Sequence, residues 1–305
     1  MVLLAALGLG AATWFASEAI EADLLAREVV EPAADPGDAG FEFAAIEVPG
    51  PLGDYPAWLI GDPAAEEPPV WALVVHDGAE TRSAALGLLP VLTGRNLVVM
   101  VVTYRGDAGA PPASGNRHGL GADEWEDVEA AARFAVESGS AGIVLVGRGT
   151  GGSAVLSLLR ESEAGLPVAA AVVDSAYLDP GAMVDREMEA GSVPGFLKGW
   201  GKALATFRFG VEWAPLDQVS AADEFGVPIL LIHGEDDDRV PVRLADALAA
   251  ARPDLIEYLR VPGAGHLGAF TTDPVATEAA LDGFLDRLLA EPVVIGEVER
   301  PTPPE

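Results

Sequence analysis

Short apolar runs recur along the chain and alternate with segments in which apolar residues return every three or four positions. A continuous apolar run of about five residues is typical of a strand buried on both faces, whereas the longer spacing is typical of an amphipathic helix. Strands alternating with helices predict a mainly parallel sheet with helices on both faces. The strands are expected at 70–75, 97–103, 143–146, 168–173, 229–232 and 256–261, and helices at 83–92, 123–136, 242–251 and 274–289.

The first part of this alternating region has a different pattern. Residues 41–48 and 55–60 are predicted to form two strands joined by the turn Pro49-Gly50-Pro51-Leu52-Gly53. A connection this short makes the two strands an antiparallel hairpin at an edge of the sheet. The sequence therefore predicts an α/β domain over residues 41–290 with eight strands.

Between about residues 180 and 225 the alternation stops and a mostly helical insertion is expected. Phe196, Trp200, Leu204 and Phe207 would share one face of a helix. Two interpretations remain open at this point. The face packs against the main domain, or the insertion is a small cap over a pocket.

Residues 1–17 carry no charged side chain. Seventeen residues rise roughly 26 Å as a helix, slightly less than the ~30 Å hydrocarbon core of a bilayer. We expect a membrane anchor or a signal peptide, although the basic segment typical of a signal is missing. An anchor here places the domain outside the cytoplasm. The alternatives are a cytoplasmic protein whose apolar helix packs on the domain, or a wrongly placed start codon.

The two remaining segments flank the domain. Residues 18–40 are acidic and contain Pro32 and Pro36, so a linker is expected there. Residues 291–305 contain prolines and glutamates and are expected to form a flexible acidic tail.

Charge and composition exclude several classes of function. The chain has 48 acidic and 18 basic residues, a formal net charge of −30, and such a surface repels the phosphates of nucleic acids. It has no cysteine, which excludes disulfides, thiolate metal sites and a cysteine nucleophile. Neither a metal nor a cofactor is indicated, and nucleic acid is not expected as a partner.

The densest group of glycines follows the strand at 143–146 directly. Gly147-Arg148-Gly149-Thr150-Gly151-Gly152 leads into apolar residues at helical spacing, so a strand, a tight turn and a helix are expected. This stretch resembles the nucleophile elbow of the α/β-hydrolase superfamily, G-x-S-x-G, in which a strained turn presents a serine. With Gly147 and Gly151 aligned to the motif, Gly149 stands where the nucleophile belongs.

Two later loops extend the resemblance. The segment from His233 to Pro241, HGEDDDRVP, is similar to the acid loop of α/β hydrolases, and the match implies that Asp237 is the acid of the triad. The segment PGAGH, which ends at His266, is similar to the loop of the catalytic histidine. The resemblance implies that Asp237 holds one ring nitrogen of His266 and that the other faces the elbow.

The segment His76-Asp77-Gly78-Ala79 is similar to the family's oxyanion loop, in which a glycine follows the histidine. Here Asp77 has taken that glycine's place. Its carboxylate either points inward, where it opposes a developing oxyanion, or points to solvent and caps a turn. Gly78 or Ala79, together with Thr150, are expected to supply the two oxyanion-binding N–H groups.

The resemblance extends from about residue 41 to 289. Further segments look like those of bacterial, actinobacterial-type hydrolases with an N-terminal apolar anchor, namely Tyr104 to Pro112, Gly121 to Ala131 and Asp174-Ser175. It implies an α/β-hydrolase fold and an esterase-, lipase- or peptidase-like ancestry.

No neighbouring hydroxyl is expected to replace the serine fully. Thr150 is a weak substitute because its side chain diverges from the apex of the turn. Ser153 lies one turn into the helix, and Ser175 ends the next strand without an activating turn. Glycine also relieves the strain of the elbow, which costs other residues about 1–3 kcal/mol.

Three hypotheses of function follow. The first is a catalytically impaired or non-catalytic hydrolase homologue that retains the Asp237–His266 pair and acts in binding or regulation. The second is an active hydrolase of carboxylic esters or related acyl compounds that uses another nucleophile or an activated water. The third is a structural or interaction module attached to the membrane. A small acyl or ester-like molecule is the expected ligand in the first two cases.

Overall fold

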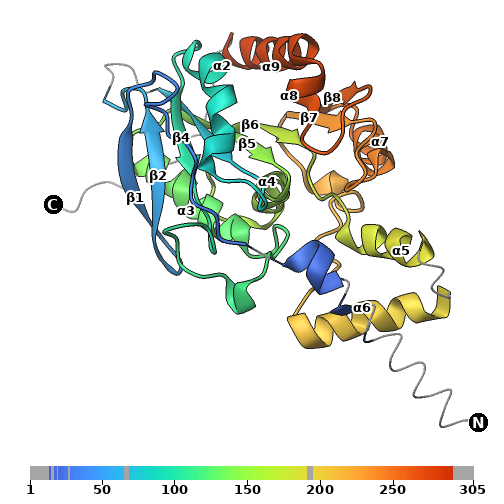
Figure 1. Ribbon diagram of the computed structural model, residues 1–305. Helices are drawn as coiled ribbons and strands as arrows, with labels where there is room; N and C mark the ends of the chain where they lie inside the picture. Colours follow the sequence, from blue (N-terminus) through green and yellow to red (C-terminus); the bar gives the residue numbers. More distant parts are fainter. Residues whose placement is uncertain are drawn as a thin grey trace, which may run out of the picture.

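An eight-stranded sheet runs through the centre of the protein in the computed structural model, which describes residues 14, 17–18, 20–26, 28–64, 69–190 and 195–290 (Figure 1). The order of strands is β1-β2-β4-β3-β5-β6-β7-β8. β2 is antiparallel to β1 and to β4, and all other neighbours are parallel. The strands are β1 (Ala44–Gly50), β2 (Gly53–Ile60), β3 (Val70–Val75), β4 (Val98–Val102), β5 (Gly142–Arg148), β6 (Val168–Asp174), β7 (Ile229–Gly234) and β8 (Ile256–Val261).

Helices cover both faces of the sheet and form a core on each. Apolar side chains of α3 (Glu124–Glu137), α4 (Thr150–Glu161) and α7 (Val242–Ala251) pack on one face. On the other face lie α2 (Leu89–Thr93), α8 (Ala269–Thr272) and α9 (Pro274–Leu289), with the 3₁₀ helix η2 (Arg82–Leu88) before α2. Short 3₁₀ helices η3 (Ser114–Asn116) and η4 (Ala222–Glu224) lie in connections.

The apolar runs explain this layering. β4 and β5 are buried along their whole length, as expected for central parallel strands, whereas β1 alternates between exposed and buried positions at the sheet edge. The prediction of a mainly parallel eight-stranded sheet, begun by an antiparallel hairpin and covered by helices on both faces, is confirmed.

The insertion forms two helices, α5 (Pro180–Ala190) and α6 (Gly195–Phe209), beside the main domain (Figure 1). Ala205 of α6 is fully buried in a small cluster with Val184 of α5 and Leu216. The side chains of Trp200 and Phe207, in contrast, are 63% and 87% exposed. The expectation that their shared face packs on the domain or covers a pocket is therefore wrong for these two residues. Helical spacing identified the face, but α6 contacts the domain from its opposite side, through buried Ala205 and partly buried Phe209.

The segment before the hairpin joins the insertion to the domain. The π-helix η1 (Glu21–Leu25) places Leu25 in the same small cluster as Ala205, and the Glu21 carboxylate accepts two hydrogen bonds from Arg117, at 2.9 and 2.7 Å. Part of the predicted linker is thus packed on the protein. Of the predicted anchor, only Trp14 and Ser17 are described, and the predicted tail at 291–305 lies outside the described residues. Among the described residues, no helix has both the length and the apolar character needed to cross a bilayer.

Candidate functional site

The elbow has the backbone of a strained turn but no side chain at its apex. Gly149 lies between β5 and α4 with φ 51° and ψ −119°, a conformation that costs energy for residues with a Cβ. The glycines around it allow close packing. A Cβ on Gly147 would lie 2.6 Å from the carbonyl oxygen of Gly151, and one on Gly151 would lie 2.3 Å from that of Val75. Glycine is therefore required at 147 and 151 for steric reasons, because a side chain at either position would clash with the backbone.

The carboxylate of Asp77 points inward and fills the space above Gly149. A Cβ on Gly149 would lie only 2.0 Å from Oδ1 of Asp77. The same Oδ1 accepts a 2.8 Å hydrogen bond from the backbone N–H of Thr150, and Oδ2 accepts one of 3.0 Å from that of Ala79. Thr150 and either Gly78 or Ala79 were predicted to supply N–H groups to an oxyanion, and it is the N–H groups of Thr150 and Ala79 that bind Asp77. The protein's own carboxylate now occupies both of them.

The surroundings keep this buried carboxylate charged. Burial alone raises the pKa of Asp77, but hydrogen bonds from the N–H groups of Thr150 and Ala79 and the nearby charge of His266 hold it below its ordinary value. Of the two orientations open from the sequence, the inward one is correct. The site therefore presents negative charge where a serine hydrolase develops it during reaction.

The predicted acid and base lie together. Nδ1 of His266 is 2.9 Å from Oδ2 of Asp237. The other carboxylate oxygen of Asp237 accepts hydrogen bonds from the backbone N–H groups of Arg239 and Val240, at 2.9 and 2.7 Å. Asp237 is buried, so these bonds fix its carboxylate and thereby the orientation of the imidazole. The geometry is that of an Asp–His pair with one ring nitrogen left for a reaction partner.

That second nitrogen, Nε2 of His266, is buried and makes no hydrogen bond with any described residue. The ring of Tyr177 packs edge-on against the imidazole, with 5.8 Å between the ring centroids. Burial raises the pKa of the Tyr177 hydroxyl, which the negative charge of Asp77 also disfavours as a phenolate. Tyr177 is thus a neutral wall of the site, and no motif in the sequence pointed to it.

Arg148 links the two sides of the site, and sequence reasoning missed it. Its guanidinium is 3.1 Å from the Glu80 carboxylate and 3.3 Å from that of Asp174, and it donates a 3.3 Å hydrogen bond to the carbonyl oxygen of Leu267. Leu267 follows His266 and has a positive φ of 55°. A charged residue between two glycines at the end of a buried strand was the available signal, because such a charge requires buried partners.

The hydroxyls considered as substitutes serve the fold. Ser153 accepts from the N–H of Tyr177 at 2.9 Å, and Ser175 accepts from that of Leu267 at 3.2 Å while donating to Asp174. The hydroxyl of Thr150 lies near the Asp77 carboxylate and helps to lower its pKa. Among the described residues no hydrogen bond joins any of the three hydroxyls to His266, and those of Ser153 and Ser175 already have partners at the turn and the strand ends.

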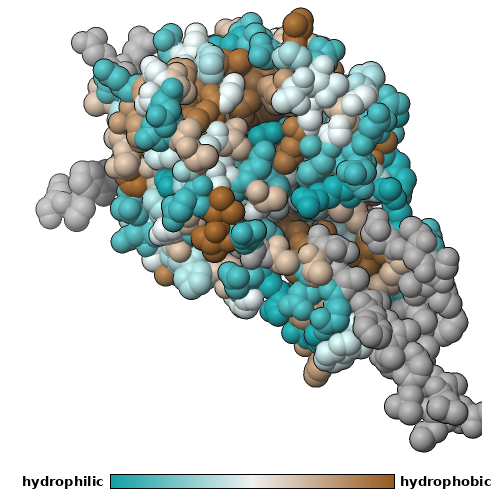
Figure 2. Space-filling view, viewed as in Figure 1, coloured by the Kyte–Doolittle hydropathy of each residue, from teal (hydrophilic) through white to brown (hydrophobic). Residues whose placement is uncertain are grey.

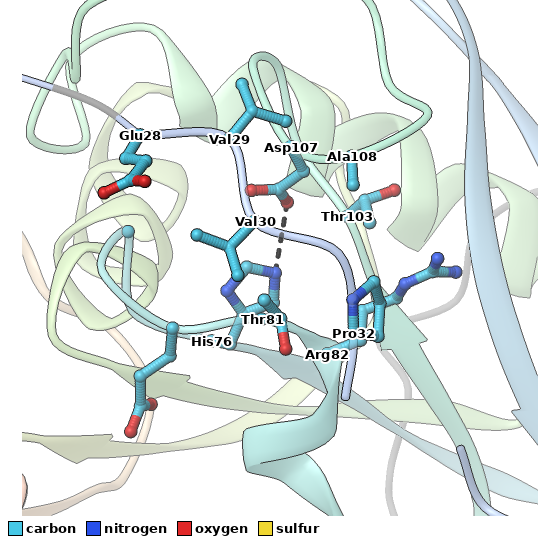
Figure 3. Close-up of a pocket in the computed structure, with 12 residues that line it drawn as sticks. Glu28, Val29, Val30, Pro32, His76, Thr81, Arg82, Thr103, Asp107 and Ala108 are labelled. Atoms are coloured by element: carbon cyan, nitrogen blue, oxygen red, sulfur yellow. Dashed lines mark ion pairs between the residues drawn. The ribbon is translucent and has the colours of Figure 1, made fainter. Parts of the chain in front are cut away.

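The loop after β3 is closed on its outer side. Gly78 could not carry a side chain, because a Cβ there would lie 2.2 Å from the ring of His118. Nε2 of His76 pairs with Asp107 at 3.1 Å, and Val29 and Val30 lie in front of the pair (Figure 3). The cavity between them measures about 10 Å³, room for roughly one water molecule. This cavity has no space for a substrate.

A second cavity of about 500 Å³ lies between α4, the loop before α3 and the end of α6. Arg117, Trp125 and Phe209 line it, and neither Asp237 nor His266 does. In the described part of the chain, no group of three or more potential ligands is arranged to hold a metal ion.

The sheet order and the strand–elbow–helix arrangement define an α/β-hydrolase fold. Residues 87–292 match the prolyl oligopeptidase family of peptidases, S9. This match covers more than half of the chain and includes the elbow, the acid loop and the histidine loop. The chain belongs to that family, and Asp77 lies before the matched region.

Other proteins are similar to this chain in sequence or in fold. The chain is 29% identical to uncharacterized proteins of two Mycobacterium tuberculosis strains, over 74% of this chain and 71% of theirs. Among solved structures, an esterase of Pyrococcus furiosus superposes with a TM-score of 0.68 at 18% identity, over 86% of this chain and 97% of the esterase. A puromycin-hydrolyzing peptidase of M. tuberculosis gives a TM-score of 0.60 at 21% identity, over 84% of this chain and 41% of the peptidase. At these identities the likeness concerns the fold alone.

Proposed function

We propose that this protein is a non-catalytic member of the prolyl oligopeptidase family that acts in binding or regulation through its hydrolase-like site. The carboxylate of Asp77 above Gly149 is the observation that carries the proposal. It stands in the space of the missing hydroxyl and uses both N–H groups that would stabilise an oxyanion. The serine nucleophile and the free oxyanion-binding N–H groups are therefore both missing. The two changes are sterically linked, because the Asp77 carboxylate occupies space that a side chain at position 149 would need.

The chemistry explains why the remaining pair does not suffice. The Asp237–His266 pair can take a proton, but acyl transfer also requires a nucleophilic atom within hydrogen-bond reach of the base. The Asp77 carboxylate is a poor substitute because both oxygens accept hydrogen bonds and its lowered pKa reduces its basicity. An acyl or ester-like ligand would have to bind without directing its carbonyl oxygen to Thr150 and Ala79.

The test is a set of four proteins: the parent, Gly149→Ser, Asp77→Gly, and the double variant. A fluorophosphonate probe should label only the double variant, because the serine needs the space and the N–H groups that Asp77 occupies. Hydrolysis of a p-nitrophenyl ester should rise by at least about 10³-fold over the parent in the double variant. Covalent labelling of the parent that disappears in His266→Ala would contradict the proposal.

A second candidate is an active acyl hydrolase in which His266 activates a water directly. The buried Nε2 without a hydrogen-bond partner among the described residues is the observation that favours it. This candidate predicts ester hydrolysis by the parent, without covalent labelling, that is lost in both His266→Ala and Asp237→Asn. Activity that survives both variants would remove this candidate.

The third candidate, an interaction module at the membrane, rests on the uncharged N-terminal residues. We propose that they attach the protein to a bilayer and leave the domain outside the cytoplasm. Fractionation of cells that produce the full chain, followed by protease treatment of intact cells, tests both parts. A protein recovered in the soluble cytoplasmic fraction contradicts the candidate.

A further inference from the structure

The cavity between α4, the loop before α3 and the end of α6 lies apart from the Asp237–His266 pair, which does not line it. Its volume of about 500 Å³ is in the range of cavities that hold small organic ligands. Trp125, Phe209 and Leu216 form apolar parts of its wall and come from α3, α6 and the segment after α6. Tertiary packing thus assembles a ligand-sized space that the hydrolase-like site does not explain.

The lining of this cavity carries negative charge. The carboxylates of Asp123, Glu161 and Glu212 belong to it. The guanidinium of Arg117 also lines it, but that group pairs with the Glu21 carboxylate at 2.7 Å. Because Glu21 is not part of the lining, Arg117 has its own counter-charge and does not balance the other carboxylates. The cavity therefore favours a positively charged ligand over a negatively charged one.

Two of these carboxylates are exposed and have no partner in the described part of the chain. Asp123 stands at the N-cap of α3, where an aspartate normally accepts a hydrogen bond from the first turn, but its side chain makes no such bond. Glu212 likewise has neither a side-chain hydrogen bond nor an ion pair with any described residue. Glu161, in contrast, lies 3.7 Å from Arg160. Asp123 and Glu212 are thus available to a cation that enters the cavity.

The aromatic wall distinguishes this cavity from the rest of the acidic surface. The chain has 48 acidic residues, and hydrophilic side chains also cover the surface over α7 (Figure 2). The ring of Phe209 already faces the guanidinium groups of Arg117 and Arg208, which lie 4.8 and 4.6 Å from its centroid. Trp125 faces no such cation among the described residues and follows Asp123 by two positions. An indole and two unpaired carboxylates thus line one space, a combination suited to an organic cation.

We propose that this cavity binds a small organic cation, a protonated amine or quaternary ammonium group carried on an apolar body. The body packs against Trp125 and Leu216, and the cationic head lies near Asp123 and Glu212. Because both carboxylates are exposed, the head keeps part of its hydration and each ion pair contributes modestly. This binding is independent of the Asp77 site and holds whether or not that site hydrolyses a substrate.

Three probes with one apolar body and different head groups test the charge preference. They are phenylbutylamine, phenylbutanol and phenylbutyrate, and their dissociation constants are measured with the full chain at low ionic strength by ligand-observed NMR. The amine should bind at least about fivefold more tightly than the alcohol, because exposed ion pairs each contribute a factor of about two to five. Phenylbutyrate should bind more weakly than the alcohol, and added salt should reduce the advantage of the amine.

Substitutions then locate the bound cation. Asp123→Asn and Glu212→Gln should each weaken amine binding about threefold, and together about tenfold, without changing the affinity for the alcohol. Asparagine is as good a helix N-cap as aspartate, so α3 should be retained. Glu278→Gln is the matched control, because it removes an exposed carboxylate of α9 that has no partner among the described residues, and amine binding should not change. Trp125→Leu should weaken the amine and the alcohol alike, about threefold, since the indole contacts their shared body.

Four outcomes would overturn the proposal. Equal affinities for the amine and the alcohol would make the cavity an apolar site without a charge preference. An equal loss of amine binding in Glu278→Gln would indicate a general attraction of cations to the acidic surface. Preferential binding of phenylbutyrate would show that Arg117 is available to a ligand in spite of Glu21. No binding of any probe at millimolar concentration, with the circular dichroism of a folded chain, would show that the cavity takes no small organic ligand.

Discussion

The two halves of the candidate site differ in their contacts. In one half, Asp237 holds His266 in the orientation of a catalytic base, with 2.9 Å between the paired atoms. In the other half, the elbow has no side chain at Gly149, and Asp77 fills both the nucleophile's space and the oxyanion-binding N–H groups. The Asp–His pair of a hydrolase fold can thus keep its geometry while a single carboxylate fills the space above the elbow and accepts hydrogen bonds from the two neighbouring N–H groups.

Arg148 precedes Gly149 and donates a hydrogen bond to the carbonyl oxygen of Leu267, next to His266, so it contacts both halves. Its replacement should have the largest effect on stability. Arg148→Met leaves the carboxylates of Glu80 and Asp174 without their cation, although burial already raises the pKa of Glu80. Breaking a buried ion pair from one side costs about 3–5 kcal/mol. Urea unfolding should show this loss. An Arg148→Lys variant is the control and should recover only part of it, since one ammonium cannot reach all three partners.

Gly149→Ser should be the next largest change. The new Cβ would lie 2.0 Å from Oδ1 of Asp77, and the serine would have to adopt the positive φ of Gly149. We therefore expect the free energy of unfolding to fall by about 2–3 kcal/mol. Asp77→Gly in the same chain removes the clash but leaves the backbone strain. A double-mutant cycle should therefore give a coupling energy of about 1–2 kcal/mol between the two positions. Additive effects would show that Asp77 does not fill the serine's space.

Asp77→Asn tests the contribution of the negative charge of Asp77, in the half of the site that contains Gly149, to stability. The asparagine oxygen can accept one of the two N–H groups, but its NH₂ would face the other, so at pH 7 we expect a loss of about 1.5–3 kcal/mol. Because the folded protein lowers the pKa of Asp77, its stabilisation is complete above the ordinary value of 3.8 and is lost as the pH falls through the lower folded value. The difference between parent and variant should shrink in acid. A difference that grows in acid would contradict this assignment.

The smallest expected effect concerns His76, which lies behind Asp77. Burial lowers the pKa of His76, but the charge and hydrogen bond of Asp107 outweigh it and raise the pKa above 6.5. The resulting stabilisation is complete below 6.5 and is lost as the pH rises through the folded pKa. Asp107→Asn should reduce this pH dependence by on the order of 1 kcal/mol. Thermal unfolding between about pH 6 and 8 would measure it, and an unchanged profile would contradict the pairing.

Much of the fold could be predicted because its signals are local. The apolar runs predicted β3 and β8 with the observed bounds, and the helical spacing did the same for α7 and α9. The turn at the elbow could also be predicted, because its glycines stand where a Cβ would clash with neighbouring atoms. The segment at 83–92 was less regular than expected and became the 3₁₀ helix η2 followed by α2.

The site could be predicted only in part. Motif spacing named Asp237 and His266, and the structure brings them together. Spacing could not choose between the two orientations of Asp77, because that choice depends on N–H groups from two separate loops. It also gave no indication of Tyr177, which reaches the imidazole from the loop after β6.

The sequence by itself determined the strands, the helices and the absence of a hydroxyl at Gly149, because these follow from side-chain type and local periodicity. Tertiary structure decided which hydrogen-bond partners the Asp77 carboxylate has and which side of α6 is buried. The Asp77 carboxylate points inward because two N–H groups lie within hydrogen-bond distance. Trp200 and Phe207 of α6 are exposed because the opposite side of the helix, with Ala205 and Phe209, contacts the domain. Such choices depend on surfaces that exist only after distant segments have packed together.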